Sequence, residues 1–321
     1  MKIFTATIIV ASFLCGLAIV ASSYSHTISK VKRGDGSPIY YYMESAKSGL
    51  KSDTLLVAFQ GSDCNSVKHN DFIKDFSKGS WPSADLLLIE KPGITPSLPH
   101  DMSTERTDCP VYYLKNDNPI QRVQDARAVV SRVLEDRRYN NVIALGGSEG
   151  ATVAAMFAAE SRIPDVVVLI NGGGRWFLED VFHNIKSTTS EHQLSSELEG
   201  FKGFAEHILE AEPFDIEVSN HGYAWWRSML TIDQQSVLSQ INVPVLVVQG
   251  GRDKSVSPKA VTNMISGLQK AGKDNIELLA YPEMDHGLIA QDGQSMMQKV
   301  TGDIFLWLKT SLQPELNKSV H

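Results

Sequence analysis

Residues 142–160 read VIALGGSEGATVAAMFAAE, and this stretch decides the fold. The apolar run 142–145 predicts a short buried strand, and the alanine-rich half that ends the stretch predicts a helix. Between them stands Gly146-Gly147-Ser148-Glu149-Gly150, the Gly-x-Ser-x-Gly pattern of a nucleophile elbow. Such a turn strains the serine backbone, and crowding favours glycine two positions away on either side. It lifts the Ser148 hydroxyl clear of the sheet, in front of the free N–H groups of a helix N-terminus.

Two other predicted strands end at residues that suit a serine nucleophile. Strand 243–249 is followed by Asp253, and strand 276–281 is followed by His286. Imidazole titrates near neutrality, so His286 can accept the Ser148 proton and return it to a leaving group. Asp253 would then fix the imidazole tautomer and stabilise the imidazolium. These residues form the predicted catalytic triad, and they stand in the chain order serine, aspartate, histidine.

Other residues compete for two of these roles. Asp285 or Glu283 could supply the acid in place of Asp253, although Asp285 is too close in sequence to reach the far imidazole nitrogen easily. The other histidines do not follow a strand end and precede a glycine, so they are weaker candidates for the base. They are His26, His69, His100, His183, His192, His207, His221 and His321.

With these motifs, the chain resembles the α/β-hydrolase superfamily of serine hydrolases from about residue 38 to about residue 312. The resemblance rests on the elbow at Ser148, on Gly-Gly-Arg-Asp at 250–253 and on Asp-His-Gly at 285–287. It implies an α/β fold, in which a doubly wound, mostly parallel sheet carries a helical cap inserted after strand 6. It also implies an enzyme similar to esterases, lipases and dienelactone hydrolases. Serine at the elbow argues against the dehalogenases, which use aspartate there.

An acyl transfer also needs an oxyanion hole, for which two backbone N–H groups are the expected donors. One would belong to Glu149, the residue after the nucleophile, and the other to the loop after the third strand. That strand is predicted at 54–59 and is followed by Gln60-Gly61-Ser62-Asp63. Lipases and esterases often carry His-Gly-Gly here, and this departure leaves the second donor open. We select Ser62, with Gly61 as the alternative.

The chain is predicted to consist of a signal peptide and three further segments, and the superfamily resemblance implies these three. We expect the hydrolase core at 24–174 and 241–321 and a helical cap at 175–240. About seventy residues separate the predicted strand 166–170 from the next one, which is where these enzymes insert a cap. Its aromatic residues favour a packed lid, and some could line a substrate pocket. They are Trp176, Phe177, Phe182, Phe201, Phe204, Tyr223, Trp225 and Trp226.

The N-terminus predicts export. Residues 1–23 contain Lys2, a long apolar run and the small residues Ala21-Ser22-Ser23, as in a cleaved signal peptide. An uncleaved membrane anchor is the alternative, because the apolar run is nearly long enough to span a bilayer. We therefore expect a secreted or periplasmic protein with no stable membrane span after cleavage.

Export to an oxidising compartment favours a disulfide between Cys64 and Cys109, the two cysteines left after cleavage. Both follow strand ends at the expected ligand-binding edge of the sheet. Such a bridge would hold two active-site loops together. Two separate buried thiols are the alternative.

Composition limits the function further. A net charge of −7 without any lysine- or arginine-rich run argues against nucleic-acid binding. The sequence has no His-Glu-x-x-His or Cys-x-x-Cys pattern, so no metal and no other cofactor is implied. We expect a serine hydrolase that cleaves carboxylic esters of small molecules. The alternatives are a peptidase of the proline-specific exopeptidase type and a non-catalytic binding protein on the same scaffold.

Overall fold

One eight-stranded sheet organises the computed structural model, which describes residues 28–46, 51–101 and 106–312. The strands lie in the order β1-β2-β4-β3-β5-β6-β7-β8. They are β1 Ile28–Lys32, β2 Pro38–Glu44, β3 Thr54–Phe59, β4 Asp85–Ile89, β5 Asn141–Gly147, β6 Val166–Ile170, β7 Val245–Gly250 and β8 Ile276–Tyr281. The predicted signal peptide at 1–23 lies outside the described residues.

The sheet is parallel except at one edge. Strands β4, β3, β5, β6, β7 and β8 run parallel to one another. Strand β2 pairs antiparallel with β4, and β1 pairs antiparallel with β2. The predicted doubly wound, mostly parallel sheet is therefore confirmed. The antiparallel pair β1–β2 at the edge was not predicted from the sequence.

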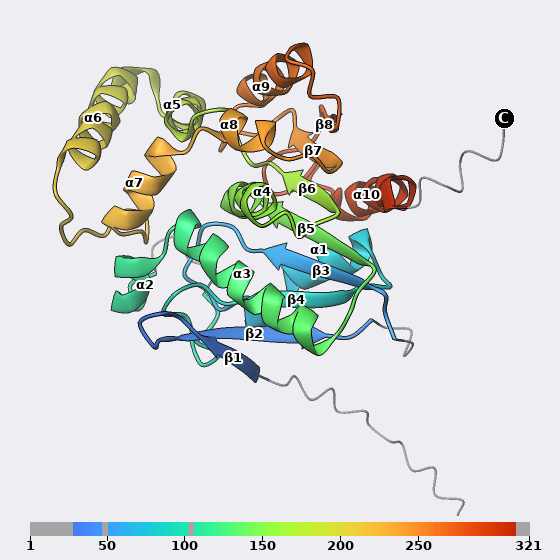
Figure 1. Cartoon of the computed structure of the whole chain (residues 1–321). Coiled ribbons are helices and arrows are strands. Elements are labelled where there is room, and N and C mark those ends of the chain that lie inside the picture. The colour runs from blue at the N-terminus through green and yellow to red at the C-terminus, as the bar shows by residue number, and fades with distance from the viewer. Residues whose placement is uncertain (1–27, 47–50, 102–105, 313–321) are drawn as a thin grey trace, which may run out of the picture.

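Helices cover both faces of this sheet. They are α1 Asp71–Ser80, α2 Val111–Asn116, α3 Pro119–Asp136, α4 Glu149–Ser161, α5 Phe177–Thr188, α6 Glu191–Glu210, α7 Tyr223–Thr231, α8 Gln234–Ser239, α9 Pro258–Lys270 and α10 Met297–Leu312, with a 3-10 turn, η1, at Val67–His69. Figure 1 shows α3 and α4 crossing in front of the central strands. No helix in the described ranges combines the length and apolar character needed to cross a membrane.

The central strands are buried because both of their faces are covered. In β3, Leu55 and Val57 face a core shared with α3, α4, α8 and α9. The alternate residues Leu56 and Ala58 face a second core, to which α1 and α10 contribute. This alternation follows from the two-residue period of a strand. It fixes the carboxyl ends of the parallel strands along one edge.

The predicted boundaries agree closely with the structure in the core. Strands β3, β6 and β8 have the predicted bounds. Helix α9 begins where the Ser257 side chain accepts the N–H of Ala260 at 3.2 Å, with Pro258 at its first position. Helix α10 begins at Met297. Helices α1 and α2 were not predicted.

Between β6 and β7 the chain forms the helices α5 to α8. Helices α5, α6 and α7 pack on one another through an aromatic cluster that includes Trp225 and Trp226. In Figure 1, α6 and α7 lie well away from the sheet, beyond its carboxyl edge. Helix α8 instead contacts α4 and α9, and its Leu238 belongs to the main core. The segment that stands outside the core is therefore α5 to α7.

Candidate active site

The structure brings Ser148, Asp253 and His286 together at the carboxyl edge of the sheet. Nε2 of His286 lies 3.1 Å from Oγ of Ser148, and Nδ1 lies 2.8 Å from Oδ2 of Asp253. The three residues follow β5, β7 and β8, so the parallel strands deliver them to one edge. The Asp253 side chain has no exposed surface, whereas that of His286 is 29% exposed. This is the geometry of a base held between a nucleophile and an orienting acid.

The elbow holds Ser148 in a strained conformation. Its φ is +53° and its ψ is −130°, a region that residues with a side chain rarely adopt. A Cβ added to Gly146 would lie 2.0 Å from the Gly150 carbonyl oxygen, and one added to Gly150 would lie 2.1 Å from that of Phe59. Only glycine fits either position. The crowding expected from the Gly-x-Ser-x-Gly pattern is therefore present in the fold.

The Asp253 carboxylate is held in place by hydrogen bonds from groups other than His286. Its Oδ1 accepts the backbone N–H groups of Ser255 and Val256 at 2.8 and 3.0 Å. Its Oδ2 accepts the Gln249 amide at 3.3 Å as well as His286 Nδ1. These contacts fix the carboxylate beside the imidazole ring.

The two alternative acids point elsewhere. Oδ1 of Asp285 accepts the backbone N–H of Ile289 at 2.8 Å, within the loop after β8. Glu283 is exposed in the same loop. Of the three acids considered from the sequence, Asp253 alone is in contact with the His286 imidazole.

Two residues that the sequence analysis missed support the triad loops. Asn171, at the end of β6, has a φ of +48°; its Oδ1 accepts the Gly250 N–H at 2.9 Å and its Nδ2 donates to the His286 carbonyl at 3.0 Å. His183 of α5 places Nε2 2.9 Å from the Asp253 carbonyl oxygen. Asparagine directly after a strand and before glycines was the available signal, because asparagine tolerates the left-handed region. No local signal marks His183.

The predicted oxyanion loop lies against the elbow. A Cβ on Gly61 would be 3.4 Å from the Gly147 carbonyl oxygen and 3.5 Å from Ser148 Cβ. Ser62 follows Gly61 and lines a cavity on the lid side of this loop. The roles of the backbone N–H groups of Ser62 and Glu149 as oxyanion donors stay predictions.

The side chain of Glu149 lies beneath the site. Its Oε1 accepts Nη1 of Arg122 at 2.8 Å, and both side chains are buried. Burial by itself would raise the pKa of Glu149, but the charges of Arg122 and Lys91 and smaller contributions together outweigh burial and hold this pKa below its usual value. Nη2 of Arg122 also donates to the Gln60 carbonyl at 2.6 Å. One buried ion pair thus joins the elbow to the loop that begins at Gln60.

A small cavity of about 270 Å³ opens onto Ser148 and His286. Its walls are mainly apolar, and they come from the ends of the central strands, from α1 and from the loop after His286. The apolar side chains that line it are Phe59, Phe72, Ile73, Phe76, Leu145, Ile170 and Leu288. This size falls just below the usual range for drug-sized ligands, so the cavity suits a small apolar group.

A larger cavity of about 1250 Å³ adjoins the small one, and Asn70 and Phe72 line both. It lies between the oxyanion loop and the lid. Of the aromatic lid residues, Phe177, Trp225 and Trp226 line it. The rings of Phe182, Phe201 and Phe204 contact other lid rings instead.

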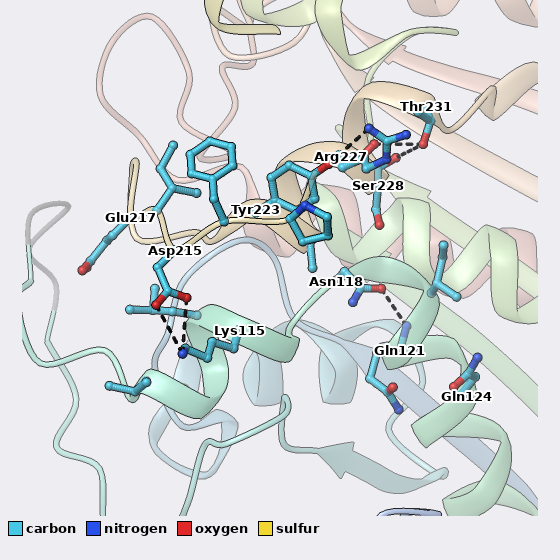
Figure 2. Close-up of a pocket in the computed structure, with 17 residues that line it drawn as sticks. Lys115, Asn118, Gln121, Gln124, Asp215, Glu217, Tyr223, Arg227, Ser228 and Thr231 are labelled. Carbon is cyan, nitrogen blue, oxygen red and sulfur yellow. Dashed lines mark hydrogen bonds and ion pairs between the residues drawn. The ribbon is translucent and has the colours of Figure 1, made fainter. Parts of the chain in front are cut away.

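A third cavity, of about 980 Å³, is separate from the triad (Figure 2). It is lined by α2, the start of α3, the 213–217 loop and α7. Figure 2 shows Lys115 of α2 next to Asp215, and their closest N–O distance is 3.3 Å. Ser148, Asp253 and His286 do not line this cavity.

The site lies in a segment that matches a known family. The sequence profile of the prolyl oligopeptidase family matches residues 113–315, which contain Ser148, Asp253 and His286. The esterase EstD from Thermotoga maritima is 26% identical over 174 residues, covering 54% of this chain and 41% of EstD. The chain therefore spans less than half the length of that relative.

Solved esterase structures have the same fold. Est1E from Butyrivibrio proteoclasticus superposes with a TM-score of 0.58 at 14% identity, over 89% of this chain and 98% of Est1E. The esterase Pf2001 from Pyrococcus furiosus gives a TM-score of 0.57 at 14% identity, over 90% of this chain and 92% of its own. Similarity at this level of identity establishes the fold alone, and it confirms the α/β-hydrolase fold expected from the sequence.

Proposed function

Because this chain belongs to the prolyl oligopeptidase family, we propose that it is a serine hydrolase that cleaves carboxylic esters through an acyl-enzyme. The observation that carries the proposal is the position of His286 between Ser148 Oγ and Asp253 Oδ2, at 3.1 and 2.8 Å. A nucleophile, a base and an orienting acid in this geometry suit acyl transfer.

In the proposed reaction, Ser148 Oγ attacks the ester carbonyl carbon while His286 Nε2 accepts the hydroxyl proton. The carbonyl oxygen becomes an oxyanion, which the backbone N–H groups of Glu149 and Ser62 would stabilise. Collapse of this intermediate breaks the bond to the alcohol oxygen, and His286 gives the departing alcohol its proton. Water then attacks the acyl-enzyme by the same steps. The products are one alcohol and one carboxylic acid.

The small cavity beside Ser148 supports a compact acyl group. Its volume of about 270 Å³ and its apolar walls, with Phe59, Phe72 and Phe76, suit a short or medium acyl chain or a single aromatic ring. A solved structure of Est1E is described as having ferulic acid bound, and ferulic acid is an acid of that aromatic kind. Long acyl chains would extend beyond this cavity, so we propose that they are poorer substrates.

A peptidase is the second candidate, because the family takes its name from a peptidase. Four lid glutamates are candidate ligands for a substrate amine. All four are exposed, and none lines either cavity beside Ser148; they are Glu179, Glu191, Glu197 and Glu199. None of these four can therefore bind a substrate amine beside Ser148, whereas other acidic residues, such as Asp71 and Glu217, do line the larger cavity.

We also propose that the protein acts outside the cytoplasm. The support is the disulfide between Cys64 and Cys109, whose Cα atoms lie 5.8 Å apart, because structural disulfides persist in oxidising compartments. Expression of the full chain, followed by separation of cytoplasmic and exported fractions, tests this. Protein that stays in the cytoplasm with both thiols free would contradict it.

The activity is tested with matched chromogenic substrates. p-Nitrophenyl esters of short, medium and long acids are compared with aminoacyl p-nitroanilides, including prolyl ones, using the wild type and Ser148→Ala. We expect kcat/KM to be highest for short or aromatic esters and negligible for all substrates with Ser148→Ala. Preference for the anilides would support the peptidase. Wild-type rates no faster than those of Ser148→Ala on every substrate would indicate a non-catalytic binding protein.

A further inference from the structure

A buried lysine holds the loop that carries the predicted oxyanion donor. Lys91 follows β4, and only 2% of it is exposed. Its Nζ donates to the Gly61 carbonyl at 2.6 Å and also to the Asp63 carbonyl. These two carbonyls flank Ser62, so Lys91 contacts the loop on both sides of that residue.

The contact with the Gly61 carbonyl constrains the next N–H group. Gly61 C=O and Ser62 N–H belong to one peptide unit, and in a trans peptide they point in opposite directions. The described residues contain no cis peptide bond. Drawing the carbonyl oxygen of Gly61 toward Lys91 therefore turns the N–H of Ser62 to the other side of the loop. Since Gly61 lies directly against Ser148 Cβ, that peptide unit borders the nucleophile.

The preceding carbonyl is held in the same way. Arg122 donates to the Gln60 carbonyl at 2.6 Å, so two successive carbonyls of this loop each accept a hydrogen bond from a buried cation. Hydrogen bonds from charged donors are stronger than neutral ones, which makes rotation of either peptide unit costly. The loop is therefore held by two buried cations from elsewhere in the fold, in addition to its own contact between Gln60 Nε2 and Asp63 Oδ1 at 2.6 Å.

Lys91 is balanced by acidic groups around it. Asp117 is buried, and neither of its carboxylate oxygens has a hydrogen-bond donor among the described residues. Burial raises the pKa of Asp117 to about 7, and the positive charge of Lys91 opposes that rise. Tyr113 lies under Lys91, with Nζ 5.8 Å from its ring centre, and its hydroxyl donates to the same Asp63 carbonyl at 3.2 Å.

We propose that Lys91 is a positioning residue for the reaction: by holding the Gly61 carbonyl, it directs the Ser62 N–H toward the oxyanion that forms at Ser148. The proposal rests on the proposed ester hydrolysis. It accounts for a buried charged side chain whose two contacts flank the predicted donor.

The test compares Lys91→Met with Tyr113→Phe. Lys91→Met removes the donor to the Gly61 and Asp63 carbonyls. Tyr113→Phe removes a donor to the Asp63 carbonyl and the hydroxyl contact with His221 Nδ1, and it leaves the donor to the Gly61 carbonyl in place. We expect kcat for a short ester to fall roughly 10- to 100-fold in Lys91→Met with little change in KM, since misaiming an oxyanion donor costs less than deleting one. We expect Tyr113→Phe to keep kcat within a few-fold of the wild type.

Two inhibitors separate positioning from a general structural role. A trifluoromethyl ketone adds to the serine and places an oxyanion in the hole, whereas an alcohol with the same chain occupies the cavity without one. In Lys91→Met, Ki for the ketone should rise by the factor by which kcat/KM falls, and Ki for the alcohol should stay unchanged. Equal losses for both inhibitors, or unchanged kcat, would overturn the proposal.

A second variant covers the case in which Lys91→Met does not fold. In Lys91→Met/Asp117→Asn, the buried ammonium and the buried carboxyl group whose pKa it influences are removed together, so neither is left buried without the other. The same kinetic and inhibitor results are expected. A double variant with wild-type kcat would overturn the proposal even if ester hydrolysis itself is established. A wild type without esterase activity would overturn the proposed function first.

Discussion

His286 Nε2 lies 3.1 Å from Ser148 Oγ, although the two residues are 138 positions apart in the chain. The distance is short because β5 and β8 are parallel strands of one sheet, and the loop after each strand begins at the same edge. The contact joins a residue in a strained turn to a residue in a loop, and Asn171 holds that loop by the His286 carbonyl. We expect nucleophile and base to act as one unit.

Replacing Asp253 tests the assignment of the acid. Asp253→Asn leaves the shape intact but favours the wrong imidazole tautomer, so kcat should fall by roughly three to four orders of magnitude, as in other triads. The matched control is Asp285→Asn, because Asp285 contacts its own loop and not the imidazole. The control should keep kcat within a few-fold. The reverse pattern would assign the acid to Asp285.

The pH dependence of the rate tests the base. Only neutral imidazole can accept the Ser148 proton, so kcat/KM for a good ester should fall as the pH is lowered and the base takes up a proton. The fall should follow a single ionisation on the acid side. A profile that is flat from about pH 5 to 8, with chemistry shown to limit the rate, would speak against a histidine base.

Reduction of the disulfide should affect both stability and rate. Cys64 and Cys109 are 45 positions apart, and the chain-entropy model gives about 4 kcal/mol for closing such a loop. Cys64 also follows Asp63, whose carbonyl contacts Lys91 and Tyr113. A reductant should therefore lower both Tm and kcat. Two alkylatable thiols in exported protein would refute the bridge, and an unchanged kcat after reduction would refute only the coupling to the loop.

Stability should depend on pH through His221. This residue is buried, stacks on Trp225 with ring centres 3.7 Å apart, and lies 3.2 Å from the Tyr113 hydroxyl. Burial lowers its pKa to about 3 from 6.5, with Glu149 opposing and Lys91 and Arg122 adding to the shift. Below about pH 6.5, His221 therefore binds a proton in the unfolded chain but stays neutral in the folded chain. The contribution of neutral His221 to the free energy of unfolding is complete above about pH 6.5 and is lost as the pH falls toward 3.

The corresponding measurement is the free energy of unfolding by urea at several pH values between 7 and 4. His221→Phe, which can still stack on Trp225, should lose less stability over this interval than the wild type. His192→Phe, at an exposed position on α6, is the control and should follow the wild type. Parallel pH curves for the wild type and His221→Phe would contradict the prediction.

The sequence alone predicts the central strands and the three triad positions, because both depend on local patterns. A short apolar run followed by Gly-Gly-Ser or by Asp-His-Gly indicates a strand and the functional turn after it. The β1–β2 pair was not predicted, because β1 is largely exposed. Its short alternation of charged and apolar residues has no buried face, so it lacks the apolar signal of a strand.

The groups that hold the triad in place could not be predicted, since they depend on contacts between distant elements. In the sequence, nothing distinguishes Lys91 from any other lysine after a strand. Only the pairing of β3 with β4 brings the Gly61 carbonyl within 2.6 Å of its Nζ. Arg122 lies on α3, whose helical pattern gives no sign that it pairs with Glu149. Glu149 was selected only for its backbone N–H, and its buried side chain was unexpected.

The most direct test of the proposed function is covalent labelling of Ser148. The full chain is treated with a fluorophosphonate probe, digested and mapped by mass spectrometry, with Ser148→Ala and His286→Ala alongside. Because nucleophile and base work together, we expect one labelled residue, Ser148, in the wild type, no label in Ser148→Ala and strongly slowed labelling in His286→Ala, with esterase turnover lost in both variants. Labelling at another residue, or full turnover by Ser148→Ala, would contradict the mechanism.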